Sequence, residues 1–585
     1  MTPFQKTQDT LDRLIPLPTN LPKIYLLGDT GAGKTTIIRQ VLGTTSLRFP
    51  SVRRTRTTIA VTEYVLSKES LFRAAIVFKP IEEIERYVRE ILEDTILRAY
   101  RLNQSGKLRL EELITNLEES PDQRFRLRFM MGQADRRSVA IIITDQLLPR
   151  LRGWISQNFP DEKDDLEILI ELALDDGLES YMKEMQSKIN ASITKAIENV
   201  CGSPNASFPE FHTIEDTNLD EFIRKLKPFL DAEDGTISPI IERARVRGNI
   251  SAAWLPANLE IVLIDGEGIG HDIKEANKSS LSPRHLDFFY SSDVILLVED
   301  SERPFIAGGK SALLTLARNG FLTKSVVAFS KIDKIEGERT EQIAEVDKSL
   351  RNLLNALTEE EGVSIVREQL DVRHLGNMDT ASTDDQTKAE IISLLADVRK
   401  RITATKPAYV RPVYDFELLA PFLDHATAEF RAMWDRYLSN DLAYRKPWQT
   451  IKAFNYRMLW GQDEYKDMRP VEDLHTELML KLERFITSPT MWEREVTEML
   501  RGVSVDKFKQ EFTIALVQLI RDILVYQNEQ YWRVSAELRG SGSTRDRASR
   551  IRNLLHQSAP SMTDEHARKF KDAVKECFKR SLQKI

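Results

Sequence analysis

The stretch "KIYLLGDTGAGKTTIIRQVLG", residues 23–43, contains an apolar run, a glycine-rich turn and a second apolar run. This pattern predicts a β-strand, a loop and an α-helix in direct succession. Residues 28–35 match GxxxxGK[ST] at every fixed position. In such a loop, backbone N–H groups and the N-terminus of the following helix surround a phosphate group. The stretch therefore predicts an α/β domain that binds a nucleotide through this loop.

Two side chains of the loop have predictable tasks. Lys34 is expected to neutralise the β- and γ-phosphate oxygens, and Thr35 to give its hydroxyl to Mg²⁺. The other nucleotide contacts expected from this segment come from Gly28, Asp29, Thr30, Gly31, Ala32, Gly33 and Thr36. A chance match to the motif is the alternative, but a preceding strand and a following helix are the context that the motif requires.

Length and composition describe a large globular protein. The 585 residues provide for two or three domains, and they are 41% hydrophobic and 30% charged with a formal net charge of −7. This balance argues against a dedicated nucleic-acid binder. Cys201 and Cys577 stand far apart without metal-ligand spacing, which fits a reducing cytoplasm. We find neither a signal peptide nor an apolar run long enough to cross a membrane.

A second motif follows another apolar run. In "LEIVLIDGEGIGHD", residues 259–272, Asp265 and Gly268 form the pattern DxxG. An aspartate at a strand end can hold a Mg²⁺-bound water, and a glycine three positions later can offer its N–H to a γ-phosphate. DxxG alone is common, so its value here depends on the strand before it and the phosphate loop upstream.

A third motif concerns the base. "SVVAFSKIDKIEG", residues 325–337, ends an apolar run with Ser330, Lys331 and Asp333, close to the guanine-reading pattern [NT]KxD. An aspartate carboxylate accepts hydrogen bonds from guanine N1–H and the 2-amino group, which adenine does not offer. A surface Lys-x-Asp after a buried strand is the alternative. An ATP-driven machine is a further alternative, but it lacks an LSGGQ signature and leaves Lys331 and Asp333 unexplained.

With these motifs in order, the chain resembles the P-loop GTPases over residues 23–404. The resemblance implies a mostly parallel sheet with helices on both faces, with a last strand in 371–379. It also implies a switch threonine that completes Mg²⁺ coordination beside Thr35 and Asp265. Thr58 is the expected residue, with Thr57 as the alternative.

Roughly two hundred residues separate Thr58 from Asp265, and much of this span has helical periodicity, as in 80–103 and 164–189. We therefore predict a helical insertion over 79–240, after an N-terminal segment 1–22. Within the return to the sheet, Arg243 to Arg247 is expected to pair with 259–265.

Beyond residue 405 the strand signals largely cease. Apolar stripes in "VEDLHTELMLKLERFI" and "FKQEFTIALVQLIRDILVY" predict an all-α domain over 405–585. The one segment that looks flexible is 538–552, a Gly/Ser tip flanked by arginines. Its ordinary interpretation is a mobile loop between helices, and contact with anionic lipid, RNA or a partner is the alternative.

This layout is similar to that of the dynamin-like large GTPases. The resemblance implies Mg²⁺-dependent GTP hydrolysis that drives assembly or movement of the helical parts, with self-association or a protein partner. The loop departs from dynamin at Thr30 and Gly31, and the DxxG motif departs at Glu267. No lipid-inserting paddle or pleckstrin-type module is recognisable, so membrane contact has no support. The alternative function is a GTP-dependent regulatory switch that recruits a protein partner, with slow hydrolysis as a timer.

The residue that positions the attacking water is left open by the sequence. Ile269 occupies the place where many small GTPases have a water-orienting glutamine, as is also typical of dynamin-like proteins. The candidates for this task are Asp29, Thr30 and His271. The candidates for compensating negative charge in the transition state are Arg53, Arg54 and Arg56.

Overall fold

The computed structural model describes most of the chain. The described part leaves out residues 1, 52–59, 119–125, 160–165, 203–207, 258, 270–280, 307, 362, 364, 366, 368–369, 379–382, 404–407, 442, 541, 562 and 564–566. All structural statements below concern the described residues.

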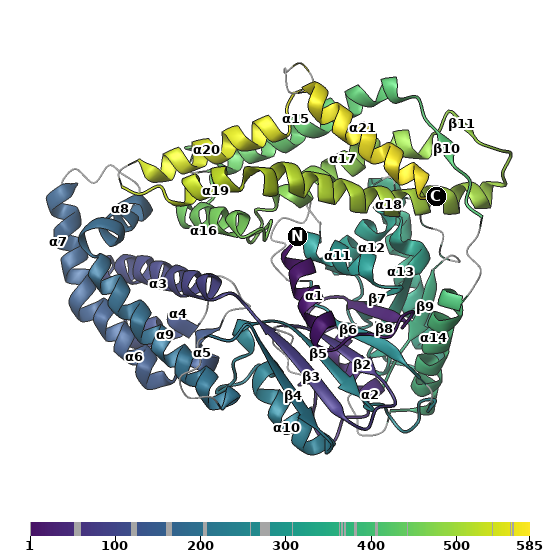
Figure 1. Ribbon diagram of the computed structural model, residues 1–585, viewed down its shortest axis with the longest axis horizontal. Helices are drawn as coiled ribbons and strands as arrows, with labels where there is room; N and C mark the ends of the chain where they lie inside the picture. The colour runs from purple at the N-terminus through teal and green to yellow at the C-terminus, as the bar shows by residue number, and fades with distance from the viewer. Residues whose placement is uncertain are drawn as a thin grey trace.

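A nine-stranded, mostly parallel sheet forms the centre of the molecule (Figure 1). Its strands are β1 (Lys23–Leu27), β2 (Val61–Leu66), β3 (Phe72–Phe78), β4 (Phe211–Asp216), β5 (Ile241–Gly248), β6 (Ile261–Asp265), β7 (Val294–Asp300), β8 (Ser325–Ser330) and β9 (Asp371–His374). They lie in the order β4-β3-β5-β2-β6-β1-β7-β8-β9. The expectation of a mostly parallel sheet is confirmed.

The strand before the phosphate loop has a central position. β1 pairs in parallel with β6 on one side and with β7 on the other. β8 pairs in parallel with β7, and β9 with β8. Because parallel strands end at the same edge, the segments that follow β1, β6, β7 and β8 meet there.

One pairing predicted from sequence is wrong. Arg243 to Arg247 lies in β5, but β5 pairs with β2 and β3 and makes no ladder with β6. The antiparallel strand β2 occupies that edge of β6 instead. All six residues of β2 are buried, so it is an interior strand of the sheet.

Helices cover both faces of the sheet. Alternate residues of β1 point to opposite faces and contact different helices there. Ile24 and Leu26 contact the core that includes α2 (Lys34–Leu42) and α14 (Asp385–Thr403). Tyr25 and Leu27 contact the core that includes α11 (Pro283–Ser291), α12 (Gly308–Arg318) and α13 (Arg339–Glu361). The N-terminal helix α1 (Pro3–Leu14) packs against β3 and β5.

The span between β3 and β5 contains a helical lobe, at the left of Figure 1. Its helices are α3 (Ile81–Gln104), α4 (Leu110–Glu118), α5 (Leu127–Met130), α6 (Gln133–Ile141), α7 (Leu148–Asn158), α8 (Leu166–Leu172) and α9 (Glu179–Cys201). The predicted helix over 164–189 is two helices with a π-helical turn between them at Ala173–Gly177. β4 and α10 (Leu219–Leu230) then return the chain to the sheet, so this span is not wholly helical.

The C-terminal part is helical, apart from two short strands, β10 (Pro412–Val413) and β11 (Met491–Trp492). Its helices are α15 (Leu419–Tyr437), α16 (Trp448–Leu459), α17 (Pro470–Thr487), α18 (Glu498–Leu524), α19 (Glu529–Ala536), α20 (Ser543–Ser558) and α21 (Ala567–Gln583). They lie across the top of Figure 1. The expected mobile loop over 538–552 is mostly the start of α20, where Arg547 is buried against backbone carbonyls.

A buried charge cluster joins the helical lobe to the C-terminal helices. Arg457 on α16 donates two hydrogen bonds, of 2.8 and 2.7 Å, to the Glu90 carboxylate on α3. Lys452, five residues earlier on α16, lies 3.0 Å from Glu171 and 3.3 Å from Glu93. Burial alone would raise the pKa of Glu93, but Lys452 and nearby arginines hold it well below its ordinary value. Two segments that are distant in sequence are therefore held by paired charges.

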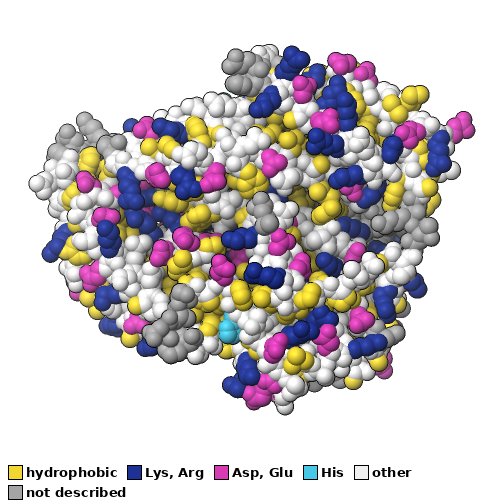
Figure 2. Space-filling model, viewed as in Figure 1, with side chains coloured by type: hydrophobic (Ala, Val, Ile, Leu, Met, Phe, Trp, Pro, Cys, Tyr) yellow, Lys and Arg dark blue, Asp and Glu magenta, His cyan; other side chains and the backbone are white. Residues whose placement is uncertain are grey.

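The surface carries mixed charges. On the face shown in Figure 2, basic and acidic side chains alternate, and hydrophobic side chains gather between the C-terminal helices and the sheet. In the described part of the chain, no helix has the length and apolarity needed to cross a membrane.

Candidate nucleotide-binding site

Glycines set the path of the loop between β1 and α2. Gly28, Gly31 and Gly33 have φ angles of 146°, 86° and 102°, a region that L-residues rarely adopt. Gly28 also passes so close to β7 that a Cβ atom would lie 2.2 Å from the Val298 carbonyl oxygen. The loop conformation therefore requires glycine at these positions. Gly33 ends the loop at the N-cap of α2.

Lys34 is buried within the loop that it follows. Its Nζ donates hydrogen bonds to the Gly28 carbonyl at 2.7 Å and the Asp29 carbonyl at 3.0 Å. Only 6% of the side chain surface is exposed. The ammonium group thus lies inside the ring of loop backbone, where the helix N-terminus also favours an anion.

The next residue connects the loop to the DxxG segment. Thr35 Oγ1 donates a 3.0 Å hydrogen bond to Asp265 Oδ2, and both side chains are buried. A hydroxyl and a carboxylate oxygen are the hard ligands that Mg²⁺ prefers. This donor pair, supplied by α2 and the end of β6, fits the predicted metal site.

Asp29 and Thr30 point toward different neighbours. A Cβ atom on Gly308, the first residue of α12, would lie 1.9 Å from Asp29 Oδ1. A Cβ atom on Gly268 would lie 2.6 Å from Thr30 Oγ1. Thr30 Oγ1 is buried and has no hydrogen-bond partner among the described residues. The hydroxyl of Thr30 therefore faces the glycine of DxxG, whereas the carboxylate of Asp29 faces the start of α12.

The backbone of the DxxG segment also contacts the loop. Ile269 N–H donates to the Gly28 carbonyl at 3.1 Å, and the Ile269 side chain is buried. Motifs that are more than two hundred residues apart in sequence are thus adjacent at one edge of the sheet.

The third motif lies at the end of β8. Ser330 Oγ is 2.5 Å from the Ala32 carbonyl oxygen and 3.1 Å from the Glu299 carbonyl oxygen, so its hydroxyl supports the phosphate loop. A Cβ atom on Gly33 would lie 3.1 Å from the same hydroxyl oxygen. The small side chain of Ser330 fits this contact with little space to spare.

Lys331 and Asp333 extend away from β8 on a 3-10 turn. Lys331 adopts φ 57°, and its Nζ lies 2.5 Å from Asp300 Oδ2 at the end of β7. Asp333 Oδ1 accepts a 2.7 Å hydrogen bond from the Asn377 backbone N–H, in the segment after β9. A carboxylate has about four acceptor positions, so this contact leaves capacity for a base.

Glu299 is a buried acid beside the phosphate loop. Its Oε2 accepts a 2.9 Å hydrogen bond from Phe305 N–H, and Oε1 has no hydrogen-bond partner in the described part of the chain. Burial, together with the nearby charges of Asp29 and Asp300, raises the pKa of this carboxyl group to about 8, although the Phe305 N–H and Lys34 act in the opposite direction. Glu299 is therefore protonated at neutral pH.

Several predicted site residues fall outside the described residues. These are Thr57, Thr58, His271, Arg53, Arg54 and Arg56. Their roles stay predictions from sequence.

Sequence reasoning did not identify three residues that the structure places at this edge. Glu299 accepts a hydrogen bond from the backbone that follows β7, and Asp300 pairs with Lys331. Asn377 donates its backbone N–H to Asp333. The position of Glu299 and Asp300 at the end of an apolar strand was a usable signal, because the carboxyl ends of parallel strands line such sites. Asn377 acts through its backbone, so its side chain carries no signal.

Comparisons with known proteins add little to this geometry. No protein-family model and no curated protein matches the chain. Two solved structures of an oligomerised bacterial dynamin pair, described as sensing and tethering membranes over long range, align with 99% of this chain. They are 11% and 12% identical, with TM-scores of 0.31 and 0.30, and 73% and 75% of those chains are covered. Scores this low carry no argument about the protein.

Proposed function

We propose that the protein binds GTP with Mg²⁺ and hydrolyses it to GDP and phosphate. The observation that carries this proposal is the meeting of three motifs at one edge of the sheet. Direct hydrogen bonds connect the loop after β1 and the start of α2 to Asp265 at the end of β6 and to Ser330 at the end of β8. The proposal further divides the chain into a nucleotide domain over 23–404, a helical insertion over 79–240 and a helical domain over 405–585.

In this proposal each element of the loop has an electrostatic task. Loop N–H groups and the N-terminus of α2 hold the phosphates, and Lys34 exchanges its backbone carbonyl partners for phosphate oxygens. Thr35 and Asp265 hold Mg²⁺, which supplies compensation for the phosphate charge. Gly268 offers its N–H toward the γ-phosphate, and Thr58 completes the metal ligands.

Among the candidates for positioning water, we propose Thr30. Its hydroxyl has a spare hydrogen-bonding capacity and faces Gly268, the residue assigned to the γ-phosphate. Asp29 is directed toward α12 instead, which makes it the weaker candidate.

Base selectivity provides the first test. GTP should bind at least about tenfold more tightly than ATP in a calorimetric titration with Mg²⁺, because Asp333 accepts from two guanine donors. Asp333→Asn should bring xanthosine nucleotides closer to GTP, since the amide can donate where the carboxylate only accepts. Equal affinity for GTP and ATP would show that the guanine assignment is wrong.

Phosphate chemistry provides the second test. Lys34→Ala and Thr35→Ala should each abolish or severely weaken GTP hydrolysis, because they remove the cation and the metal ligand of the loop. The loop shape depends on glycines, so circular dichroism should show a retained fold. Hydrolysis at the parental rate in either variant would place the active site elsewhere.

A further inference from the structure

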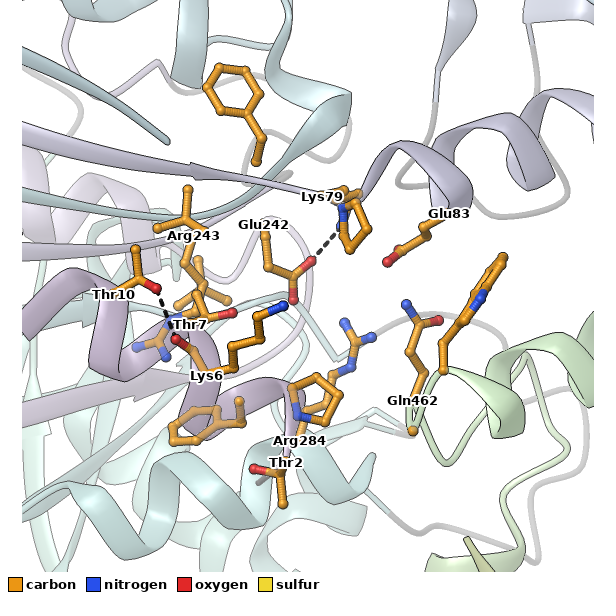
Figure 3. A pocket seen from close by; sticks show the side chains of 18 of the residues that line it. Thr2, Lys6, Thr7, Thr10, Lys79, Glu83, Glu242, Arg243, Arg284 and Gln462 are labelled. Atoms are coloured by element: carbon orange, nitrogen blue, oxygen red, sulfur yellow. Dashed lines mark hydrogen bonds and ion pairs between the residues drawn. The ribbon is translucent and has the colours of Figure 1, made fainter. Parts of the chain in front are cut away.

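A cavity of about 600 Å³ lies where the sheet, the start of α3 and the C-terminal helices meet. Figure 3 shows Lys6, Lys79 and Arg284 extending toward Glu242 from different elements, with Gln462 on the opposite wall. The same cavity is lined by Glu267, the third residue of DxxG, and by Asp463 and Arg521 of the C-terminal domain. The DxxG segment and the C-terminal domain therefore line the same cavity.

Arg284 connects these two parts. It lies in the first turn of α11, and its guanidinium is 3.9 Å from Glu267 and 3.6 Å from Glu464. Glu464 belongs to the loop 460–469 between α16 and α17, and it also accepts a 2.7 Å hydrogen bond from Ser282. Both distances to Arg284 exceed those of a close hydrogen-bonded ion pair. Glu242 also acts on this guanidinium, and the three carboxylates together raise the pKa of Arg284 although burial alone would lower it.

A neighbouring ion pair, between Arg521 and Asp287, has shorter distances than those of Arg284. Arg521 on α18 donates two hydrogen bonds, of 2.8 and 2.9 Å, to Asp287 on α11. Its Nε donates at 2.6 Å to Asp463 of the loop 460–469. Arg521 therefore anchors α11 to the C-terminal domain, while Arg284 borders the cavity and has room to change partners.

We infer that Arg284 is a positioning residue that couples the nucleotide state to the C-terminal helices by sharing its guanidinium between Glu267 and Glu464. This inference rests on the proposed function. When a γ-phosphate draws the N–H of Gly268, the adjacent Glu267 moves away from Arg284. Arg284 then loses one of its three carboxylate neighbours and moves toward Glu464, so it holds the loop 460–469 more firmly.

Hydrogen exchange on the full chain tests the inference. With a saturating non-hydrolysable GTP analogue, backbone amides in 461–469 should exchange at least about twofold more slowly than with GDP. In Arg284→Gln this difference should vanish, while calorimetry still detects binding of both nucleotides. Arg284→Lys keeps the charge and should retain part of the difference. If Arg284→Gln does not fold, Glu464→Gln removes the same ion pair from the other side.

Arg469→Gln is the matched control. Arg469 also pairs with Glu464, at 3.6 Å, and with Glu472 of α17, at 3.5 Å, so it holds Glu464 from the side of the C-terminal domain. This variant should retain the nucleotide-dependent difference. Equal exchange in both states of the parent protein, or an unchanged difference in Arg284→Gln, would overturn the coupling while GTP binding stands. Absence of any guanine nucleotide binding would instead overturn the proposed function together with this inference.

Discussion

At the scale of single residues, Thr30 retains a buried hydroxyl that has no hydrogen-bond partner among the described residues. A buried polar group without a partner lowers stability by about 1–3 kcal/mol. The presence of the Thr30 hydroxyl at the phosphate loop despite this loss of stability is consistent with a role of the hydroxyl in the reaction.

This cost makes the Thr30→Val variant informative. Valine has nearly the same shape and removes the hydroxyl, so the free energy of unfolding without nucleotide should be equal or higher. If Thr30 positions the attacking water, kcat for GTP should fall roughly a hundredfold, with a much smaller change in KM. Denaturant unfolding and steady-state kinetics measure the two effects. A stable variant with the parental kcat would remove Thr30 from the mechanism.

Glu299 gives a prediction about pH. The folded-state pKa of about 8 is above the ordinary value of 4.5, so the folded state binds this proton more tightly than the unfolded state. The corresponding stability is fully present below pH 4.5 and is lost as the pH rises toward 8. Relative to Glu299→Gln, the parent should therefore lose up to about 1.4 kcal/mol of unfolding free energy per pH unit in this window.

Urea unfolding of both proteins between pH 5 and pH 8 checks this expectation. The exposed Glu302 lies three residues after Glu299, in the turn after β7, so Glu302→Gln serves as the matched control and should follow the parent. Parallel pH curves for the parent and Glu299→Gln would show that Glu299 is ionised in the folded protein.

At the scale of secondary-structure elements, local patterns predicted the strands that carry motifs. β1, β6 and β8 are apolar runs that end in motif residues, and each was predicted as a strand. Strand order was harder to obtain, because β5 alternates apolar and charged residues and its sequence does not show which strand it pairs with. The ion pairs from Glu63 to Arg243 and Arg245 join β2 to β5, and such long-range partners have no local signature.

The candidate site divides in the same way. Residues with a fixed spacing, such as Lys34 and Thr35, were predicted from the motif alone. Contacts that depend on two strands ending together, such as Lys331 with Asp300, required the sheet order. Asn377 supports Asp333 through backbone, which no side-chain pattern can reveal.

The cluster between α3, α8 and α16 yields a prediction about stability. Lys452 is 5% exposed and lies between Glu93 and Glu171, so Lys452→Met would remove one of the cations that pair with these buried carboxylates. Removing one partner of a buried ion pair typically costs about 3–5 kcal/mol. Thermal unfolding should show a large decrease in Tm. Lys183→Met, which breaks the exposed pair with Glu179, should change it little. Similar small effects in both variants would mean that the cluster is solvated.

At the scale of the whole molecule, the helical lobe and the C-terminal helices are joined by the same cluster, whereas α11 connects the C-terminal helices to the nucleotide site. In the proposed GTP cycle, a movement that starts at the nucleotide would therefore reach both helical regions together. This arrangement suits a protein whose helical surfaces change their affinity for a second copy or a partner with each GTP cycle.

The rate of GTP hydrolysis, measured at increasing protein concentration, distinguishes an assembly-driven GTPase from a switch that recruits a partner. Ile269 stands at the position after DxxG and its side chain is buried and apolar, so this residue does not itself orient water. If a second copy completes the site, turnover per molecule should rise steeply with concentration, by roughly tenfold or more. A partner-recruiting switch should instead give a low rate that is independent of concentration. Light scattering with a GTP analogue and with GDP follows the mass of the assembly, and Lys34→Ala controls for contaminating activity. A rising rate without any increase in mass would contradict the assembly-driven mode.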